Sequence, residues 1–223
     1  MSKILIVAEH ANGKLNASTA KCLSAAKQMG ASAIEVAVFA ADPGAVAAQA
    51  AQLDGVTRVR TVANPANANA MAAVLAPQVV ALAADYTHVL GPSTTYGKDL
   101  MPCVAALLGE AMVSDIMKVH GAHRFERPIY AGNAIITVEC PAARKVVATV
   151  RNASFPAAGN GASAAPVEAA SVSATLPTHT RYVELKAGAS DRPDLQSAAR
   201  VVSGARAVGS ADNFALIYKL ADK

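Results

Sequence analysis

The amino-acid sequence predicts an α/β fold, in which helices flank a largely parallel sheet and additional antiparallel strands follow. Two observations support this prediction. In the first half of the chain, short apolar runs alternate with segments of helical periodicity. After residue 108, strand-like runs follow one another with little helix between them. The 223 residues, 53% hydrophobic and 16% charged, suffice for one large core and a smaller unit.

The first strand and helix are predicted close to the N-terminus. Residues 3–8 form a continuous apolar run, typical of a strand buried on both faces of a parallel sheet. Asn16 is placed to cap a helix, and Gly30 lies where a C-terminal cap belongs. Between them, residues at helical spacing are Thr19, Leu23, Ala26 and Met29.

Further strands and helices alternate along the next part of the chain. Strands are predicted at residues 34–39, 56–62 and 87–91, with Ala-rich helices at residues 45–53 and 69–84 between them. This order is the signature of βαβ units, so we expect these strands to be parallel.

After a helix at residues 100–108, the pattern changes. Strand-like runs occupy residues 113–119, 134–139 and 145–150. With so little helix between these runs, we expect antiparallel strands that extend the same sheet.

The first domain is predicted to span residues 1–189. Residues 155–177 are rich in Ala, Ser, Gly and Pro, whose small side chains bury little area, and therefore predict a flexible loop. Residues 181–186 predict one more strand.

A polar linker is predicted at residues 190–198, where Pro193 disfavours helix before it. Residues 199–223 then start a second α/β domain, with a strand at 199–203 and a helix at 211–222. One strand and one helix bury too little area to form a core alone, so this domain is predicted to be incomplete.

Composition argues against several classes of function. The net charge of +4 is spread along the chain without a basic stripe, so we expect no nucleic-acid binding. The longest apolar stretch, residues 71–84, is interrupted by Pro77 and is shorter than the roughly 20 residues that span a bilayer, so no direct membrane insertion is expected. The N-terminus lacks the patterns of a secretory signal or transit peptide, which favours a cytoplasmic bacterial protein.

Catalytic and metal-binding motifs are also missing from the sequence. Neither a Gly-x-Ser-x-Gly motif nor a recognisable carboxylate pair occurs, so no catalytic residue is predicted. No metal site is predicted, because the histidines and cysteines lack ligand spacing. These residues are His10, His88, His120, His123, His179, Cys22, Cys103 and Cys140.

Two glycine-containing turns are candidates for ligand binding. Residues 91–99 join a strand to a helix, as a phosphate-binding loop does, but the spacing of Gly91 and Gly97 and the acidic Asp99 do not fit that motif. A polar turn is the favoured interpretation, and a subunit contact is the alternative. Residues 203–210 combine small residues with Arg206, which indicates either an anion or cofactor site or an ordinary turn with a solvated arginine.

Several sequence motifs together resemble one family. The motifs are Val7-Ala8-Glu9-His10, Gly13-Lys14-Leu15, Gly97-Lys98-Asp99-Leu100, Ser114-Asp115-Ile116, Arg127-Pro128-Ile129-Tyr130-Ala131-Gly132-Asn133-Ala134, Val150-Arg151, Ser154-Phe155, Asp191-Arg192-Pro193-Asp194-Leu195 and Val201-Val202-Ser203-Gly204. In this order, and with Arg206 after them, they resemble the alpha subunit of an electron-transfer flavoprotein across the whole chain.

The resemblance implies a function in electron transport and fatty acid oxidation. Alpha and beta subunits of this family form a heterodimer and contribute similar nucleotide-binding-like α/β domains. FAD, held mostly by a C-terminal alpha domain, accepts electrons from acyl-CoA or other dehydrogenases and passes them to a membrane quinone oxidoreductase. The family's AMP belongs to the beta subunit. The resemblance therefore implies an electron carrier without an enzymatic site of its own.

The resemblance also implies cofactor-binding residues. Arg206 is expected beside the flavin, where its charge favours the reduced anion, and Ser203 and Gly204 are expected to support the turn. Ala205 and Ala207 stand where the family usually has glycines. Because family members continue further, the chain is expected to be truncated and not to retain FAD. The alternative function is a flavin-free structural fragment that serves only as a partner of the beta subunit.

Overall fold

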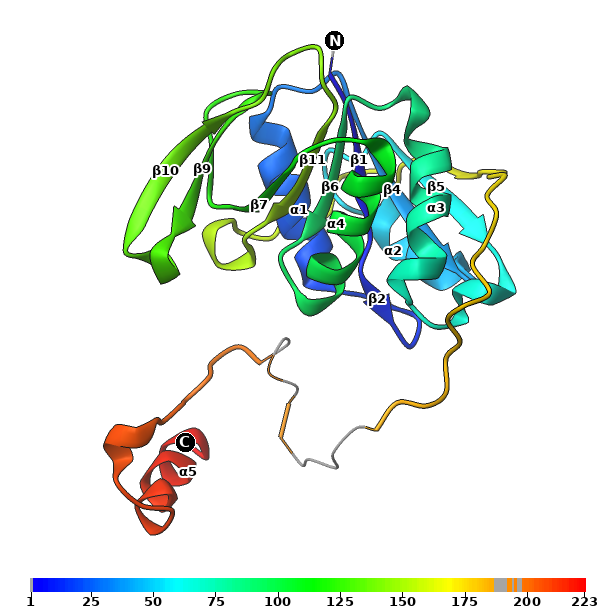
Figure 1. The fold of residues 1–223 in the computed structure, drawn as a ribbon. Coiled ribbons are helices and arrows are strands. Elements are labelled where there is room, and N and C mark those ends of the chain that lie inside the picture. Colours follow the sequence, from blue (N-terminus) through cyan, green and yellow to red (C-terminus); the bar gives the residue numbers. More distant parts are fainter. Residues whose placement is uncertain (1, 187–191, 194, 196–197) are drawn as a thin grey trace. The chain divides into compact units, whose positions relative to one another are not determined.

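The computed structural model describes residues 2–186, 192, 193, 195 and 198–223. The chain divides into two compact units, Met1–Tyr182 and Val183–Lys223, and each is described by itself (Figure 1). The predicted linker at 190–198 lies largely outside the described residues. The predicted domain limits, 1–189 and 199–223, therefore stay predictions.

Within the described residues, a seven-stranded sheet forms the centre of the first unit, and all of its pairings are parallel. The strand order is β12-β5-β4-β1-β6-β11-β7. The bounds are β1 Lys3–Val7, β4 Ala33–Ala40, β5 Arg58–Ala63, β6 His88–Pro92, β7 Met112–Ile116, β11 Val146–Val150 and β12 Val167–Ala169. The predicted α/β class and the parallel order of the first strands are confirmed.

Helices cover both faces of this sheet (Figure 1). They are α1 Ala17–Gln28, α2 Gly44–Ala51, α3 Ala72–Leu82 and α4 Thr95–Leu108. Short 3-10 turns accompany them: η1 Pro65–Ala68, η2 Ala83–Asp85, η3 Tyr130–Gly132 and η4 Asn152–Ser154. Successive side chains of a strand point to opposite faces, which is why β1 contributes to two separate cores.

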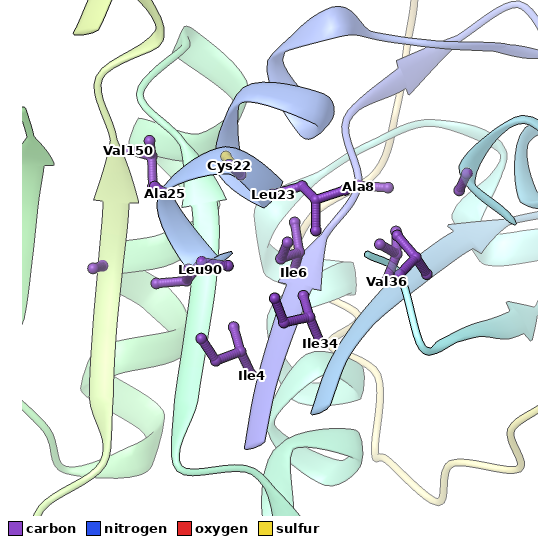
Figure 2. Packing of buried hydrophobic residues seen from close by; sticks show 14 of the residues in the cluster. Ile4, Ile6, Ala8, Cys22, Leu23, Ala25, Ile34, Val36, Leu90 and Val150 are labelled. Atoms are coloured by element: carbon purple, nitrogen blue, oxygen red, sulfur yellow. The ribbon is translucent and has the colours of Figure 1, made fainter. Parts of the chain in front are cut away.

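One core lies between the sheet and helices α1 and α2. Ile4 and Ile6 of β1 pack there with Leu23 of α1 and Val36 of β4, as Figure 2 shows. The other core lies against α3 and α4 and contains Leu5 and Val7 of the same strand. Sheet position, together with burial on both faces, explains the continuous apolar run in the sequence.

The predicted caps of the first helix are confirmed. The Asn16 side chain accepts a hydrogen bond of 2.9 Å from the backbone N–H of Ser18. Gly30 follows the C-cap with a φ of +68°, a conformation that glycine adopts without steric cost.

The prediction that antiparallel strands extend the main sheet is wrong. Strands β7 and β11 join it in parallel, whereas β8 Lys118–Val119, β9 Arg124–Ile129 and β10 Ala134–Glu139 form a separate antiparallel sheet. The predicted strand at 113–119 is divided between the two sheets. Asp115, the last but one residue of β7, has a φ of +60° at the point where the pairing of β7 with β11 shifts register, just before the chain leaves this sheet for β8. A small hairpin, β2 His10–Ala11 and β3 Lys14–Leu15, completes the strands.

The prediction of an unstructured loop at residues 155–177 is also wrong in its central part. Strand β12 lies within it and pairs in parallel with β5. Glu168 of β12 forms salt bridges with Arg58 (3.2 Å) and Arg60 (3.3 Å) of β5. All three residues of β12 are exposed, so its pairing with β5 and these ion pairs, and not side-chain burial, hold it at the sheet edge.

The described residues of the second unit form short helices and no strand. These are η5 Arg206–Val208, η6 Asp212–Phe214 and α5 Ala215–Ala221, so the predicted helix at 211–222 is present as a 3-10 turn followed by a shorter α-helix. The predicted strands at 181–186 and 199–203 are wrong, since the structure assigns no strand to those residues. A strand requires a hydrogen-bonded neighbour, and neither segment pairs with one within the described residues.

Candidate functional site

The carboxyl end of the parallel sheet is the usual ligand-binding edge of such folds. Strand β1 lies at the centre, with β4 and β5 on one side and β6 and β11 on the other. Strand order therefore reverses between β1 and β6, and in open α/β sheets ligands bind in the crevice at this switch point.

A buried carboxylate occupies this position. Glu9, two residues after the end of β1, is only 8% exposed. Its Oε2 atom accepts hydrogen bonds from Ser18 Oγ (2.8 Å) and Thr94 Oγ1 (3.0 Å). Ser18 lies in the first turn of α1 and Thr94 is the N-cap of α4, so the carboxylate lies between two helix N-termini. Such positions favour a negative charge, which a bound phosphate often supplies in nucleotide-binding folds.

The turn after β6 is packed tightly against the end of the strand. A Cβ atom on Gly97 would lie 1.8 Å from the carbonyl oxygen of Pro92. The Tyr96 hydroxyl donates a hydrogen bond of 3.3 Å to the carbonyl oxygen of Ala8. The turn at residues 91–99 is therefore a capped start of α4 and has no open phosphate loop, as the favoured interpretation of the sequence predicted.

Burial at this edge keeps neighbouring groups neutral. Desolvation, with a smaller contribution from the charge of Glu9, raises the pKa of the Tyr96 phenol and of the Cys22 thiol. Both groups therefore stay protonated at neutral pH, and neither is available as a base or a thiolate nucleophile.

A second polar cluster lies at the same edge, where β7 ends. The backbone N–H of Asp115 donates to Thr149 Oγ1 (2.8 Å), and its carboxylate accepts a hydrogen bond from Ser93 Oγ (2.7 Å). Arg151 forms a salt bridge of 3.4 Å with the same carboxylate. A left-handed conformation at a non-glycine residue costs on the order of 1–3 kcal/mol, so these bonds hold a strained turn.

The three residues predicted to bind a cofactor, Ser203, Gly204 and Arg206, lie in the second unit on one turn. Arg206 begins η5 and is exposed. Gly204 lies against the following helices, since a Cβ atom there would be 2.9 Å from Val208 Cγ2 and 3.2 Å from both Ile217 Cγ1 and Phe214 Cε2. Gly204 is thus needed for packing within the unit, independently of any ligand.

This turn does not enclose a ligand. Among the described residues of Val183–Lys223, none is buried. An open hollow of about 420 Å³ is lined by Val208, Asp212, Asn213, Leu216, Ile217 and Lys219, and Arg206 is not part of its lining. Arg206 offers a cation to a phosphate, but the described residues around it do not form the enclosing pocket that a flavin requires.

No metal centre or membrane segment is present in the described part of the chain. His, Cys, Asp and Glu side chains do not gather there in groups of three or more able to hold a metal ion. None of the described helices combines the length and apolar character needed to cross a membrane.

Comparison with known proteins identifies the family. The electron transfer flavoprotein domain matches residues 4–175. The electron transfer flavoprotein subunit alpha of Paracoccus denitrificans is 44% identical over 99% of this chain and 70% of its own length. The chain belongs to the electron transfer flavoprotein family. The alpha subunit of Pseudomonas aeruginosa is 43% identical over 99% of this chain and 70% of its own length, and the mitochondrial one of Dictyostelium discoideum is 36% identical over 99% and 66%.

Membership in the electron transfer flavoprotein family makes this chain a flavoprotein subunit related to electron carriers, and an alpha subunit implies a beta partner. The domain match covers Glu9 and its partners but ends before Ser203, Gly204 and Arg206. Glu9 lies in one of the family motifs, but the local sequence does not show that its carboxylate is buried and hydrogen-bonded. Its partner Thr94 lies 85 residues away along the chain.

Proposed function

We propose that this chain is the alpha subunit of a heterodimeric electron-transfer flavoprotein in the bacterial cytoplasm. It accepts electrons from dehydrogenases, such as acyl-CoA dehydrogenases, through FAD and passes them to a membrane quinone oxidoreductase. The proposal is carried by the 44% identity to an alpha subunit over 99% of the chain. The subunit acts as an electron carrier and has no substrate-transforming site of its own.

The first unit serves as a scaffold in this proposal. Glu9 fills the switch point where related folds bind a phosphate, and its carboxylate already satisfies the hydroxyls of Ser18 and Thr94. A phosphate entering this site would meet a buried negative charge at close range, which is strongly unfavourable. The first unit therefore positions its partner and binds no nucleotide at this edge.

The second unit contributes to flavin binding through Arg206, with Ser203 and Gly204 supporting its turn. FAD supplies the redox chemistry when it is bound. The Arg206 guanidinium attracts the negative charge of a phosphate or of a reduced flavin. An exposed ion pair contributes only about 0–1 kcal/mol, whereas a micromolar site requires roughly 8 kcal/mol. This chain alone is therefore not expected to retain FAD stoichiometrically.

A second candidate function is a flavin-free structural partner of the beta subunit. It is favoured because every described residue at positions 198–223 is at least partly exposed, so these residues do not enclose a flavin. In this case the first unit would assemble with the beta subunit while no electron transfer took place.

Flavin binding by the assembled protein distinguishes the two candidates. The chain is co-expressed with the beta subunit of the same organism, FAD is titrated into the purified pair, and a reduced acyl-CoA dehydrogenase is added. The electron-carrier function predicts saturable flavin binding, bleaching of the flavin absorbance on reduction, and weaker FAD binding by Arg206→Ala. Arg181→Ala, another exposed arginine, serves as the matched control.

Each outcome decides between the candidates. A pair that binds no FAD would overturn the electron-carrier function and leave the structural one. In the chain alone, one-to-one FAD binding tighter than about micromolar would show that its second unit forms a more complete site than the described residues indicate.

A further inference from the structure

The turn that carries Arg206 leaves through one permissive residue, Gly209. Arg206–Val208 form η5, and the chain continues through Gly209 with a φ of +87°. Ala205 precedes the turn in an extended conformation, and Ala207 has no positive φ, so neither position requires a glycine. Glycine adopts positive and negative φ values about equally readily. The placement of Arg206 relative to the helices that follow is therefore decided at Gly209.

Asn213 bonds to the chain on both sides of Gly209. Its side-chain Nδ2 donates a hydrogen bond of 2.9 Å to the carbonyl oxygen of Val208. Its backbone N–H donates one of 3.3 Å to Ser210 Oγ. A Cβ atom on Gly209 would lie 3.7 Å from the same Nδ2 atom, so the Asn213 amide lies beside the glycine itself. One residue thus closes the turn around its most permissive position.

The Asn213 side chain satisfies a carbonyl group that the backbone leaves open. The carbonyl oxygens of Ala205 and Arg206 accept hydrogen bonds from the N–H groups of Val208 (2.9 Å) and Gly209 (3.1 Å). Within the described part of the chain, no backbone N–H donates to the carbonyl oxygen of Val208. One hydrogen bond of this kind corresponds to roughly a two- to tenfold change in an equilibrium constant. Without it, Gly209 would be free to take up other conformations.

The start of the turn is anchored on the same helical segment. A Cβ atom on Gly204 would lie 3.2 Å from both Ile217 Cγ1 and Phe214 Cε2, so the backbone there packs directly against η6 and α5. Both ends of residues 204–209 are therefore fixed by residues 213–217. Arg206, between these ends, is exposed. The turn is thus held in one conformation by contacts that leave its cation accessible.

We propose that Asn213 is a positioning residue of the flavin site, which holds the turn in the conformation from which Arg206 binds the negative charge of FAD. This inference rests on the proposed function, which assigns Arg206 to FAD. A group held in its binding conformation before the ligand arrives loses less conformational entropy on binding. Because Asn213 acts through Arg206, its effect on FAD binding depends on the presence of that arginine.

A double-mutant cycle tests this dependence in the pair formed by the full chain and the beta subunit of the same organism. FAD is titrated into the pair with Asn213→Ala, Arg206→Ala, both or neither. Asn213→Ala should raise the dissociation constant of FAD by more than about twofold when Arg206 is present and by less than about twofold when it is replaced. Asn160→Ala, which shortens another exposed asparagine in the first unit, is the matched control and should change it by less than about twofold.

The reduction potential of the bound flavin gives a second readout. A less well held Arg206 stabilises the negative charge of the reduced flavin less, so Asn213→Ala should lower the midpoint potential. In the Arg206→Ala pair, the same substitution should leave the potential unchanged. A contribution of Asn213 to folding alone would not produce this difference between the two backgrounds.

Each result bears on the role of Asn213. An effect of Asn213→Ala below about twofold, or one of equal size with and without Arg206, would overturn the positioning role while leaving FAD binding intact. If Asn213→Ala abolishes binding in both backgrounds, Asn213→Gln decides, because it keeps an amide donor. Binding restored by Gln and weakened by Arg206→Ala supports the role, and binding not restored contradicts it. No FAD binding by the unchanged pair would instead overturn the electron-carrier function.

Discussion

The Thr94 hydroxyl donates a hydrogen bond of 3.0 Å to the carboxylate of Glu9, which also accepts one from Ser18. This contact joins the start of α4 to the end of β1, across the position where strand order reverses. The chain thus supplies its own anion at the helix N-termini of a fold that often binds phosphates there. Removing that anion has predictable consequences.

Replacement of Glu9 should destabilise the first unit. Glu9→Ala leaves Ser18 Oγ and Thr94 Oγ1 without their acceptor and is expected to lower the free energy of unfolding by about 2–4 kcal/mol. Glu9→Gln keeps an acceptor but loses the charge near two helix N-termini, so about 1–2 kcal/mol is expected. Urea unfolding measures both. Glu139→Ala, at an exposed strand position, should change stability by less than about 0.5 kcal/mol, and an equally small effect of Glu9→Ala would contradict the role of the carboxylate.

The close approach of α4 to β6 predicts an unusual effect at Gly97. In a helix, replacing glycine by alanine normally stabilises by about 1 kcal/mol. Gly97→Ala should instead destabilise by roughly 2–3 kcal/mol, because the new Cβ would overlap the carbonyl oxygen of Pro92. Gly159→Ala is the control, since a Cβ atom there meets no atom within 4 Å. Thermal unfolding that shows Gly97→Ala to be neutral or stabilising would mean that α4 does not lie this close to β6.

Local sequence patterns were sufficient to predict most of the first unit. The buried run of β1 and the Asn16 cap of α1 are visible within a few residues, so these elements were predicted correctly. The separate antiparallel sheet was not predicted, because the polar composition of β9 hides a strand and nothing local indicates the positive φ of Asp115.

Two further features depend on contacts that a local pattern does not contain. Strand β12 is held by the edge of β5 and by its arginines, more than 100 residues earlier. Its three residues, Val167–Ala169, are too few to give a strand signal of their own. The Glu9 cluster likewise joins residues from three separate parts of the chain. Arg206 was selected from a turn motif and a family resemblance, and its role in flavin binding stays a prediction.

The buried His88 should make stability depend on pH. Burial lowers its pKa from 6.5, while Nε2 bonds to the carbonyl oxygen of Ala122 (2.7 Å) and Nδ1 to Thr87 Oγ1 (2.8 Å). Below pH 6.5 the unfolded chain takes up a proton that the folded chain still excludes. The contribution of neutral His88 is therefore fully present above that pH and is lost as the pH falls towards the folded pKa.

Urea unfolding between about pH 8 and about pH 5 measures this dependence. The free energy of unfolding of the unchanged chain should fall towards the acidic end, and His88→Gln should flatten part of that slope while lowering stability overall. His179→Gln, at an exposed histidine, should keep the original slope. An unaltered slope in His88→Gln would show that this side chain does not carry the pH dependence.

The ion pairs of β12 predict the order of proteolytic cleavage. Residues 171–186 make no backbone hydrogen bond within the described chain, whereas Gly161 and Ala165 donate to the carbonyl oxygens of Gln52 and Ala51. Proteinase K should therefore cut within 171–186 before 155–170. Glu168→Ala, which removes both ion pairs with Arg58 and Arg60, should speed cleavage at 155–170. Mass spectrometry showing the first cut inside 155–170 of the unchanged chain would contradict the structure at this edge.

Assembly with a beta subunit is the property on which the proposed function depends most directly. Sedimentation velocity of this chain mixed with the beta subunit of the same organism measures it, with each chain run alone as the reference. We expect a single species with the mass of a one-to-one complex at concentrations of about 1 μM or above, as for other specific subunit interfaces. Two independent boundaries at the masses of the separate chains would contradict the assignment of this chain as a working alpha subunit.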